Sequence, residues 1–254
     1  ASSAASDVYK RQDFISEYGV DVLFGTQLCA VNTDGAGRVT EIIVSNKDGL
    51  KAYRAKVYAD CTGDADLAVW AGAEFEKGDV DGTLMPASLC FVIANVEEYA
   101  YRYDRNSGLC FGSMHGTNPK SVIHAIAADD EFPLVTDTHL CHQIIGPGTI
   151  GFNAGHIFNV DSTDPVSVSR AMIQGRELAR QLHEGLKKYF PSAFAGSLLV
   201  NTAPLMGIRE GRRIKGDYTL TLEDYIGRRS FPDEISRNCY YIDVHLTKKE
   251  EQAA

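Results

Sequence analysis

A short stretch near residue 60 constrains the fold more than any other part of the sequence. Residues 57–73 read V-Y-A-D-C-T-G-D-A-D-L-A-V-W-A-G-A. Residues 57–59 favour the end of a strand, and Gly63 suits a tight turn whose backbone a side chain would obstruct. We expect Asp64 to cap a short helix and Gly72 to end it. A strand, a turn and a helix N-terminus in this order suit an anion or a nucleotide, although ordinary α/β crossovers use the same residues.

Composition bounds the class of protein and its partners. The chain has 254 residues, of which 44% are hydrophobic and 23% charged, and its formal net charge is -9. This length allows one large domain or two modest ones. The acidic balance argues against nucleic acid or an anionic membrane surface as a partner, and no apolar run reaches the roughly 18 residues of a membrane span. We therefore expect a small-molecule substrate, no nucleic acid and no membrane.

The cysteines and histidines carry no metal or disulfide pattern. Six cysteines are scattered along the chain without a CxxC pair, and no two histidines have the spacing of a helical metal motif. Scattered cysteines are typical of reduced thiols in a cytosolic protein. The sequence therefore predicts a cytoplasmic protein with no metal site, and it leaves the oligomeric state open.

The first part of the chain predicts an antiparallel meander. Residues 1–12 are rich in Ser and Ala, have no periodicity and resemble a translated adapter, so we expect a non-native or disordered leader. After a helical turn that ends at Gly19, the alternating pattern and the turn residues predict strands over 20–32 (broken by Gly25), 39–45 and 53–59. The last of these strands leads into the stretch at residues 57–73.

The middle of the chain predicts a second group of strands and helices. After a glycine-containing loop over 74–86, strands are expected over 87–95, 139–145, 149–153 and 198–203, and short helices over 96–103 and 120–129.

The clearest helix covers residues 165–190. Asp164 is expected to cap it, Pro165 takes its first position, and Pro191 stops it. A core-facing stripe recurs every three or four residues, at Ala171, Gly175, Leu178, Leu182 and Leu186. Gly175 within this stripe predicts close approach of a neighbouring element, and a capping box at 221–224 predicts another short helix that ends at Gly227.

A basic cluster follows the last predicted strand. Arg209, Arg212, Arg213 and Lys215 lie within seven residues, between Gly207 and Gly216 in the sequence. A solvated basic face is one interpretation. The other is an anion site, because arginines at a strand end can form a fork with the oxygens of a carboxylate or phosphate.

Two segments resemble one known family. Residues 60–73 resemble the D-A-T-G-D-x-D-L-A…A-G-A segment of FAD-dependent oxidoreductases. These are glutathione-reductase-like flavoproteins, distantly related to the fumarate reductase flavoprotein and to heterodisulfide reductase. Residues 207–224 resemble the G-x-R-E-x-R-R-I-x-G-x-Y-x-L-T-x-x-D segment of the same family, and with D-V-H at 243–245 the resemblance spans nearly all of residues 13–245.

The resemblance implies an α/β fold with α+β elements and hydride transfer at FAD. Its parts would be a partial Rossmann-like FAD-binding domain with the meander (13–75), a mixed-sheet substrate domain (76–200) and a truncated return segment toward the FAD domain (201–254). By analogy the cofactor-binding residues are Cys61, Thr62, Gly63, Asp64 and Asp66. The candidate catalytic residues are Arg209, Arg212, Arg213 and His245, and Arg209 with either Arg212 or Arg213 would face the flavin–substrate cleft.

The departures from the family pattern define the alternatives. No GxGxxG follows a strand in these residues, and Cys61 stands where the family usually has Ala. We therefore expect a fragment of a flavoenzyme that lacks the N-terminal GxGxxG unit and the C-terminal FAD-closing segment, is itself inactive, and binds FAD poorly. The alternatives are a flavin hydroxylase or saturated-bond reductase of a neighbouring branch, and a non-catalytic β-rich ligand-binding module without cofactor.

Overall fold

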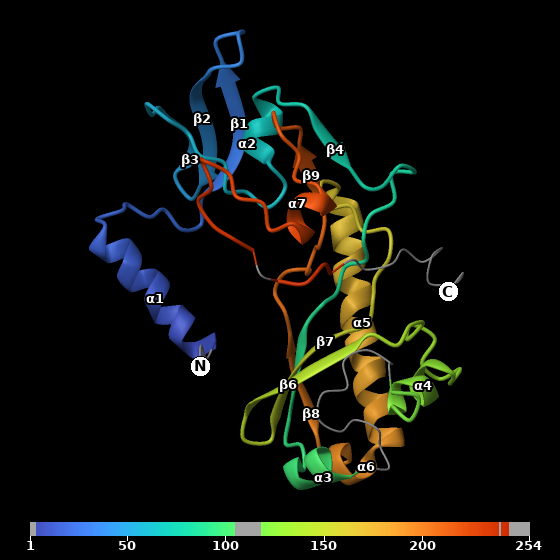
Figure 1. Ribbon diagram of the computed structural model, residues 1–254. Helices are drawn as coiled ribbons and strands as arrows, with labels where there is room; N and C mark the ends of the chain where they lie inside the picture. Colours follow the sequence, from blue (N-terminus) through green and yellow to red (C-terminus); the bar gives the residue numbers. More distant parts are fainter. Residues whose placement is uncertain (1–3, 105–117, 239, 244–254) are drawn as a thin grey trace. The chain divides into compact units, whose positions relative to one another are not determined.

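The computed structural model describes residues 4–104, 118–238 and 240–243 (Figure 1). The chain divides into two compact units, Ala1–Glu74 and Phe75–Ala254, and each is described by itself. This division falls one residue from the boundary expected between 75 and 76. The roles expected for the parts stay predictions.

Unit 1 is an antiparallel meander flanked by two helices. Its elements are α1 (Ala4–Glu17), β1 (Gln27–Thr33), β2 (Val39–Asn46), β3 (Gly49–Tyr53) and α2 (Asp66–Trp70), and the strand order is β1-β2-β3. The glycine-rich loop between β1 and β2 and the tight turn between β2 and β3 connect neighbouring strands, as the sequence predicts. The predicted antiparallel meander is confirmed.

Three expectations for unit 1 need correction. The first strand begins at Gln27 instead of residue 20, since residues 20–26 form no strand. Helix α1 begins at Ala4, so the segment expected to be irregular up to residue 12 is helical; its non-native origin stays a prediction. The third strand covers Gly49–Tyr53 instead of 53–59, because pairing with β2 begins directly after the turn, at Asn46 and Gly49. Within the described chain, residues 54–62 pair with no strand, so residues 57–59 lead into the turn as irregular backbone.

Unit 2 is built on a four-stranded sheet. Strands β5 (Phe91–Ala94), β6 (Leu140–Gly146), β7 (Thr149–Ala154) and β8 (Leu198–Thr202) are ordered β6-β7-β5-β8. All three ladders are antiparallel, where a mixed sheet was expected. The boundary expected between 200 and 201 falls inside β8, so the sheet includes the start of the expected return segment.

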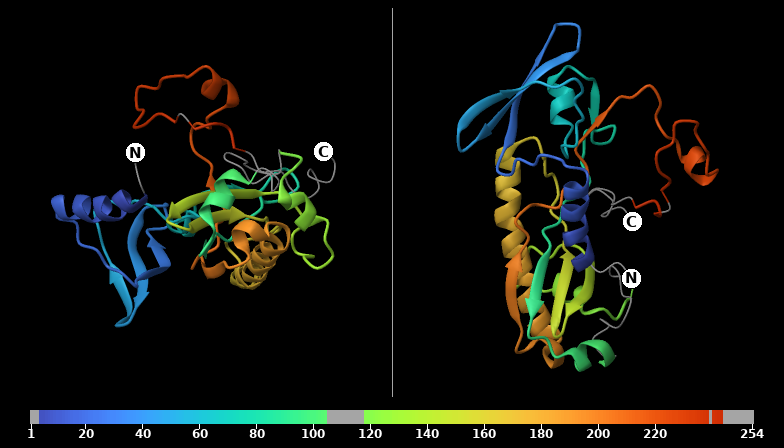
Figure 2. Two further views of the ribbon diagram at one scale, coloured as in Figure 1. Left: turned by 90° about the horizontal axis from the view of Figure 1, so that it is seen from below. Right: turned by 90° about the vertical axis from the view of Figure 1, so that its left-hand side faces the viewer.

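Helix α5 (Pro165–Tyr189) covers one face of this sheet (Figures 1 and 2). The Asp164 carboxylate accepts a hydrogen bond from the Val166 N–H at 2.9 Å, as expected of the cap. The predicted stripe is confirmed, since all five of its residues are buried. They pack with side chains from alternate positions of the strands: Leu140, Phe91, Ile93, Ile150 and Phe152. A Cβ at Gly175 would lie 2.8 Å from the Leu89 Cβ, so the predicted close approach is real.

Short helices complete the ends of this layer. They are α3 (Glu98–Tyr103), α4 (Val122–Ala127) and α6 (Pro191–Phe194), and all three contribute side chains to the same core. Helix α7 (Leu222–Ile226) has the predicted capping box between Thr221 and Asp224. Among the described helices, none is long and apolar enough to cross a membrane.

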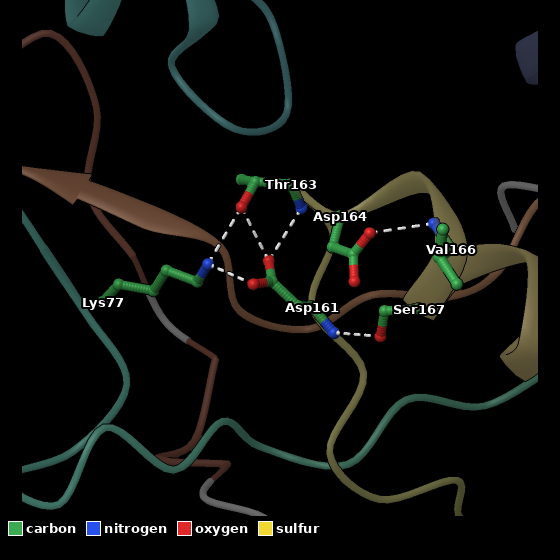
Figure 3. A network of polar contacts seen from close by, with 6 residues as sticks. All are labelled: Lys77, Asp161, Thr163, Asp164, Val166 and Ser167. Carbon is green, nitrogen blue, oxygen red and sulfur yellow. Dashed lines mark hydrogen bonds and ion pairs between the residues drawn. The ribbon is translucent and has the colours of Figure 1, made fainter.

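A two-stranded ribbon joins the two ends of unit 2's main body. Strand β4 (Phe75–Lys77) pairs antiparallel with β9 (Arg212–Ile214). The Lys77 Nζ donates to Asp161 Oδ2 at 2.5 Å and to Thr163 Oγ1 at 2.9 Å, which ties β4 to the start of α5 (Figure 3). Partial burial raises the pKa of Asp161, but the hydrogen bonds from Lys77 and Thr163 outweigh it and lower that pKa to about 2.

Candidate functional site

Asp60 organises the turn that precedes α2. Its Oδ1 accepts from the Thr62 N–H at 2.9 Å and from the Thr62 hydroxyl at 2.7 Å, and its Oδ2 accepts from the Ala68 N–H at 2.9 Å. The Thr62 hydroxyl oxygen in turn accepts from the Asp66 N–H at 2.7 Å. Partial burial raises the pKa of Asp60, but these hydrogen bonds outweigh it and hold the pKa below its ordinary value. The turn is therefore held by its own polar groups.

The start of α2 differs from the prediction, and its end agrees. The residue at the N-cap is Ala65 in the left-handed conformation (φ 55°), so Asp64 is not the cap. Asp60 and Thr62 satisfy the first N–H groups instead, because the turn brings these side chains back over the helix start. At the other end, the Gly72 N–H donates to Val69 and the Ala73 N–H to Ala68, and Gly72 has φ 101°, which is a Schellman motif.

Gly63 is not needed for the backbone conformation of the turn. Its φ lies outside the left-handed region, and a Cβ built on it would meet no atom within 4 Å. The conformational reason predicted for this glycine is therefore wrong, and the positive φ falls on Ala65. The space above Gly63 leaves the backbone of the turn approachable.

Arg209 is the most enclosed of the predicted arginines. Its Nη1 donates to the Pro86 carbonyl at 2.7 Å and to the Ser88 hydroxyl at 3.1 Å. Within the described part of the chain, Nη2 and Nε of Arg209 make no hydrogen bond. The side chain is half-buried, and burial lowers the pKa of Arg209 from its ordinary value. The guanidinium stays protonated. It therefore presents a fixed positive charge, and its Nη2 and Nε donors remain for a ligand.

Arg212 and Arg213 lie on opposite faces of one strand. They are consecutive in β9, so their side chains point to opposite faces. The Arg212 guanidinium lies 5.7 Å from the centre of the Phe75 ring. Arg213 forms an ion pair with Glu210 and donates to the Gly78 carbonyl at 2.7 Å. The strand therefore separates these two side chains, and both contact the ribbon β4–β9; a role for Arg212 or Arg213 at the substrate stays a prediction.

Acidic and thiol groups surround Arg209. Asp243, Cys90, Cys141 and Asp137 lie close enough for their negative charge, when ionised, to favour the protonated guanidinium. The fourth predicted catalytic residue, His245, lies outside the described residues. Asp243, two residues before it, places the end of the described chain within electrostatic reach of Arg209.

Two buried histidines lie beside Asp137. The rings of His139 and His156 stack with centroids 4.3 Å apart, and the His156 Nδ1 lies 3.6 Å from Asp137 Oδ1. The Asp137 carboxylate also accepts from the backbone N–H of His139 at 2.7 Å and of His156 at 3.0 Å. Sequence reasoning treated these histidines singly, because residues 17 apart carry no local spacing signal.

The sheet face opposite α5 carries a hollow that sequence reasoning missed. We call it the open face, and its side chains come from alternate strand positions: Cys90, Val92, Cys141, Gln143, Asn153 and Asn201. The hollow has a volume of about 470 Å³. The signal was present in the sequence, since Cys141, Gln143 and Ile145 alternate with core residues in the manner of a strand with one exposed face.

The structure thus divides the predicted site residues between two places. Cys61 to Asp66 lie in the turn of unit 1 that is held by its own hydrogen bonds. Arg209 lies in unit 2 at one end of the open face. Among the described residues, no group of three or more His, Cys, Asp or Glu side chains could hold a metal ion.

The sequence was compared with known protein families and with curated proteins. It matches the family described as FAD dependent oxidoreductase over residues 3–254. No curated protein matches the chain.

Proposed function

Because the chain belongs to the FAD-dependent oxidoreductase family, we propose that it forms part of an enzyme that transfers a hydride between FAD and a small organic anion. FAD, when bound, supplies the hydride chemistry. The protein supplies the binding, orientation and electrostatic groups. The environment of Arg209 is the observation from which we infer an anionic substrate. The turn at 60–66 is the part of unit 1 that we propose contacts the cofactor.

The turn fits an uncharged part of FAD better than its pyrophosphate. The backbone at Gly63 is approachable, because a Cβ there would meet no atom. Three carboxylates, Asp60, Asp64 and Asp66, lie in the same seven residues, and they would repel a pyrophosphate. Helix α2 has five residues, and side chains already satisfy its first N–H groups. We therefore propose that the turn faces the ribityl chain or the ring, and that other residues hold the pyrophosphate.

Arg209 is suited to hold a substrate carboxylate. Two hydrogen bonds through Nη1 fix the plane of the guanidinium, and the Nη2–Nε edge can donate two parallel hydrogen bonds to a carboxylate. Half-burial excludes part of the water that would weaken this ion pair. Anchoring the anion in this way would fix which carbon of the substrate is presented for hydride transfer.

The first test is flavin content. The complete gene product should purify yellow with the absorption band of bound FAD. The 254-residue chain alone should bind added FAD with a Kd above about 1 μM in a flavin fluorescence titration, since its turn lacks a group for the pyrophosphate. Submicromolar binding by this chain would contradict the fragment proposal. A colourless complete gene product would contradict the flavoenzyme and favour a ligand-binding module.

The variant Gly63→Val tests whether FAD contacts the turn at Gly63. In the complete gene product, Gly63→Val should lower the flavin content per protein at least several-fold, because the new side chain would fill the space above the turn. Gly196→Val is a control in unit 2, where a Cβ has ordinary contact with Asn95 and the φ is not left-handed. Equal flavin content in the two variants would argue against a cofactor contact at Gly63.

A further inference from the structure

We infer that the open face binds a polyhydroxylated monocarboxylate, such as a sugar acid, with its carboxylate on Arg209 and its later hydroxyl groups on the side-chain amide of Asn153. This inference rests on the proposed function, because it uses the same Arg209 anchor and names the substrate class. It assigns Asn153 as a specificity residue.

Strand register places the anchor and the amides in order along the face. Ser88, which binds Arg209, precedes Cys90 by two residues and therefore shares its face. The next row contains Cys141 opposite Asn153. The row after that contains Gln143 opposite Gly151, with Val92 opposite both Gly151 and Asn201. The Asn153 row is therefore the nearer one to Arg209, and the Gln143 row lies one step beyond it.

The spacing of these rows suits a short carbon chain. Rows two residues apart are separated by about 7 Å along a strand, so Asn153 lies roughly one such step from the Ser88 row. An extended chain of about six carbons spans roughly 6 Å, judged from the reach of a polypeptide per bond. Its carboxylate on Arg209 would thus place its later hydroxyl groups beside Asn153, and Gln143 and Asn201 lie past the end of such a chain.

The amide side chain of Asn153 selects hydroxyl groups. In the described structure, the side chains of Asn153, Gln143 and Asn201 make no hydrogen bond to protein. Each amide offers both donors and an acceptor, and a hydroxyl group offers the same pair of roles. An apolar chain in this hollow would remove water from the amides without replacing their hydrogen bonds, which costs binding free energy.

The charge around Arg209 limits the ligand to one negative charge. Asp243 and Asp137 lie within electrostatic reach of the guanidinium. They favour its protonated form and would repel the second charge of a phosphate or a dicarboxylate. A cationic ligand is disfavoured by Arg209 itself. A monocarboxylate is the remaining charged class.

Gly151 keeps the middle of the hollow open. A Cβ at this position would lie 3.3 Å from the Ile145 Cγ2, so a side chain would fill the floor between Gln143 and Val92. The hollow therefore depends on glycine at the centre of the Gln143 row.

The test compares three probes on the full chain. D-Gluconate, hexanoate and D-sorbitol are titrated separately, and binding is followed by the ¹H–¹⁵N signals of the side-chain amides. D-Gluconate should shift the Asn153 amide signals and should bind about tenfold more tightly than either of the other probes, because only it carries both the charge and the hydroxyl groups. Hexanoate or sorbitol binding as tightly as gluconate would overturn the inference, as would the absence of any shift with gluconate.

Variants separate the anchor from the amides. Asn153→Leu should weaken gluconate binding several-fold and should not weaken hexanoate binding, whereas Arg209→Met should weaken both acids. Gln143→Leu, one row beyond Asn153, should weaken gluconate binding less than Asn153→Leu. Gln174→Leu, an exposed change on α5, and Arg176→Met, also exposed there, are the matched controls. Thermal melts by circular dichroism verify that each variant folds.

The outcomes distinguish this inference from the proposed function. Loss of acid binding in Arg209→Met, with no effect of Asn153→Leu, would overturn the hydroxyl recognition and leave the anion anchor standing. Failure of the proposed function would show as a colourless complete gene product, which the probe titrations do not measure.

Discussion

The two units of the chain are stabilised in different ways. In unit 2, a 25-residue helix buries one face of a four-stranded sheet, and side chains such as Leu182, Ile93 and Phe194 have no exposed surface. Among the described side chains of unit 1, Val44 is the one buried hydrophobic residue, while Phe24 and Val57 are 89% and 82% exposed. Unit 1 therefore depends on turns and local hydrogen bonds, and unit 2 on apolar burial.

This difference matters for function. A unit with little core of its own gains a large share of its stability from whatever binds it. A unit with a closed core can hold a binding face in fixed geometry. We therefore expect the turn of unit 1 to tighten on its ligand and the open face of unit 2 to be preformed.

The largest effect should come from the core of unit 2. Leu182→Ala should lower its free energy of unfolding by about 2–5 kcal/mol, because a cavity is left under α5. Far-UV circular dichroism in urea follows α5, whereas the single tryptophan, Trp70, reports on unit 1. The circular dichroism transition should move and the fluorescence transition should not. Ile173→Ala on the same helix, where the side chain is 70% exposed, is the control. A shift of both transitions by Leu182→Ala would contradict the proposed difference in how the two units are stabilised.

Lowering the pH should destabilise unit 2 through His142. Burial lowers the pKa of His142 to about 4, against 6.5 in the unfolded chain. The unfolded state therefore binds a proton first as the pH falls, so stability is full above pH 6.5 and decreases toward pH 4, by about 2 kcal/mol at pH 5. Urea titrations at pH 7 and pH 5 measure this. His142→Gln should flatten the dependence, and an unchanged slope would show that His142 is not its source. His183, whose pKa burial also lowers, would account for a residual slope.

A smaller effect is expected at the turn of unit 1. Asp60→Ala removes the acceptor of three hydrogen bonds and should cost about 1–2 kcal/mol, in the range of a lost helix cap. Trp70 fluorescence in urea measures it, and Asp21→Ala, at an exposed site of unit 1, is the control. Asp64→Ala should cost less than Asp60→Ala. The reverse order would restore Asp64 as the helix cap.

The smallest effect is expected at Gly63. Gly63→Ala should change the stability of unit 1 by less than about 0.5 kcal/mol, because the added Cβ meets no atom and the φ is ordinary. Gly72→Ala is the matched change, and it should destabilise unit 1 because its φ of 101° is unfavourable for alanine. Equal costs at the two glycines would mean that Gly63 has a conformational role after all.

Elements with strong local signals could be predicted from the sequence. Asp164, Pro165 and the apolar stripe define α5 by contacts within a few turns of one helix, and the structure agrees at every position of the stripe. The same holds for the meander turns and for the capping box at Thr221. Local chemistry decides these features, so a single sequence is sufficient to find them.

Features that depend on distant residues could not be predicted in the same way. Asp60 was passed over as the cap of α2 because its carboxylate reaches Ala68, eight residues ahead, only after the turn has formed. The contacts of Arg212 with Phe75 and of Arg213 with Gly78 could not be predicted, because the pairing of β9 with β4 was not visible. The open face needed the register of four strands, although its alternating polar residues were readable in each strand.

The ribbon of β4 and β9 has a consequence for how such chains can change. The body of unit 2 begins directly after β4 and ends directly before β9, the antiparallel partner of β4. Both ends of the body are therefore held by one two-stranded ribbon, which forms its stem. The contact between Arg213 and Gly78 closes a loop of 135 residues. Loop-closure entropy grows slowly with length, by about 0.6 kcal/mol per doubling. The free-energy cost of closing the stem therefore depends little on how many residues the body contains. The body could be lengthened, trimmed or exchanged while the path of the remaining chain is unaltered.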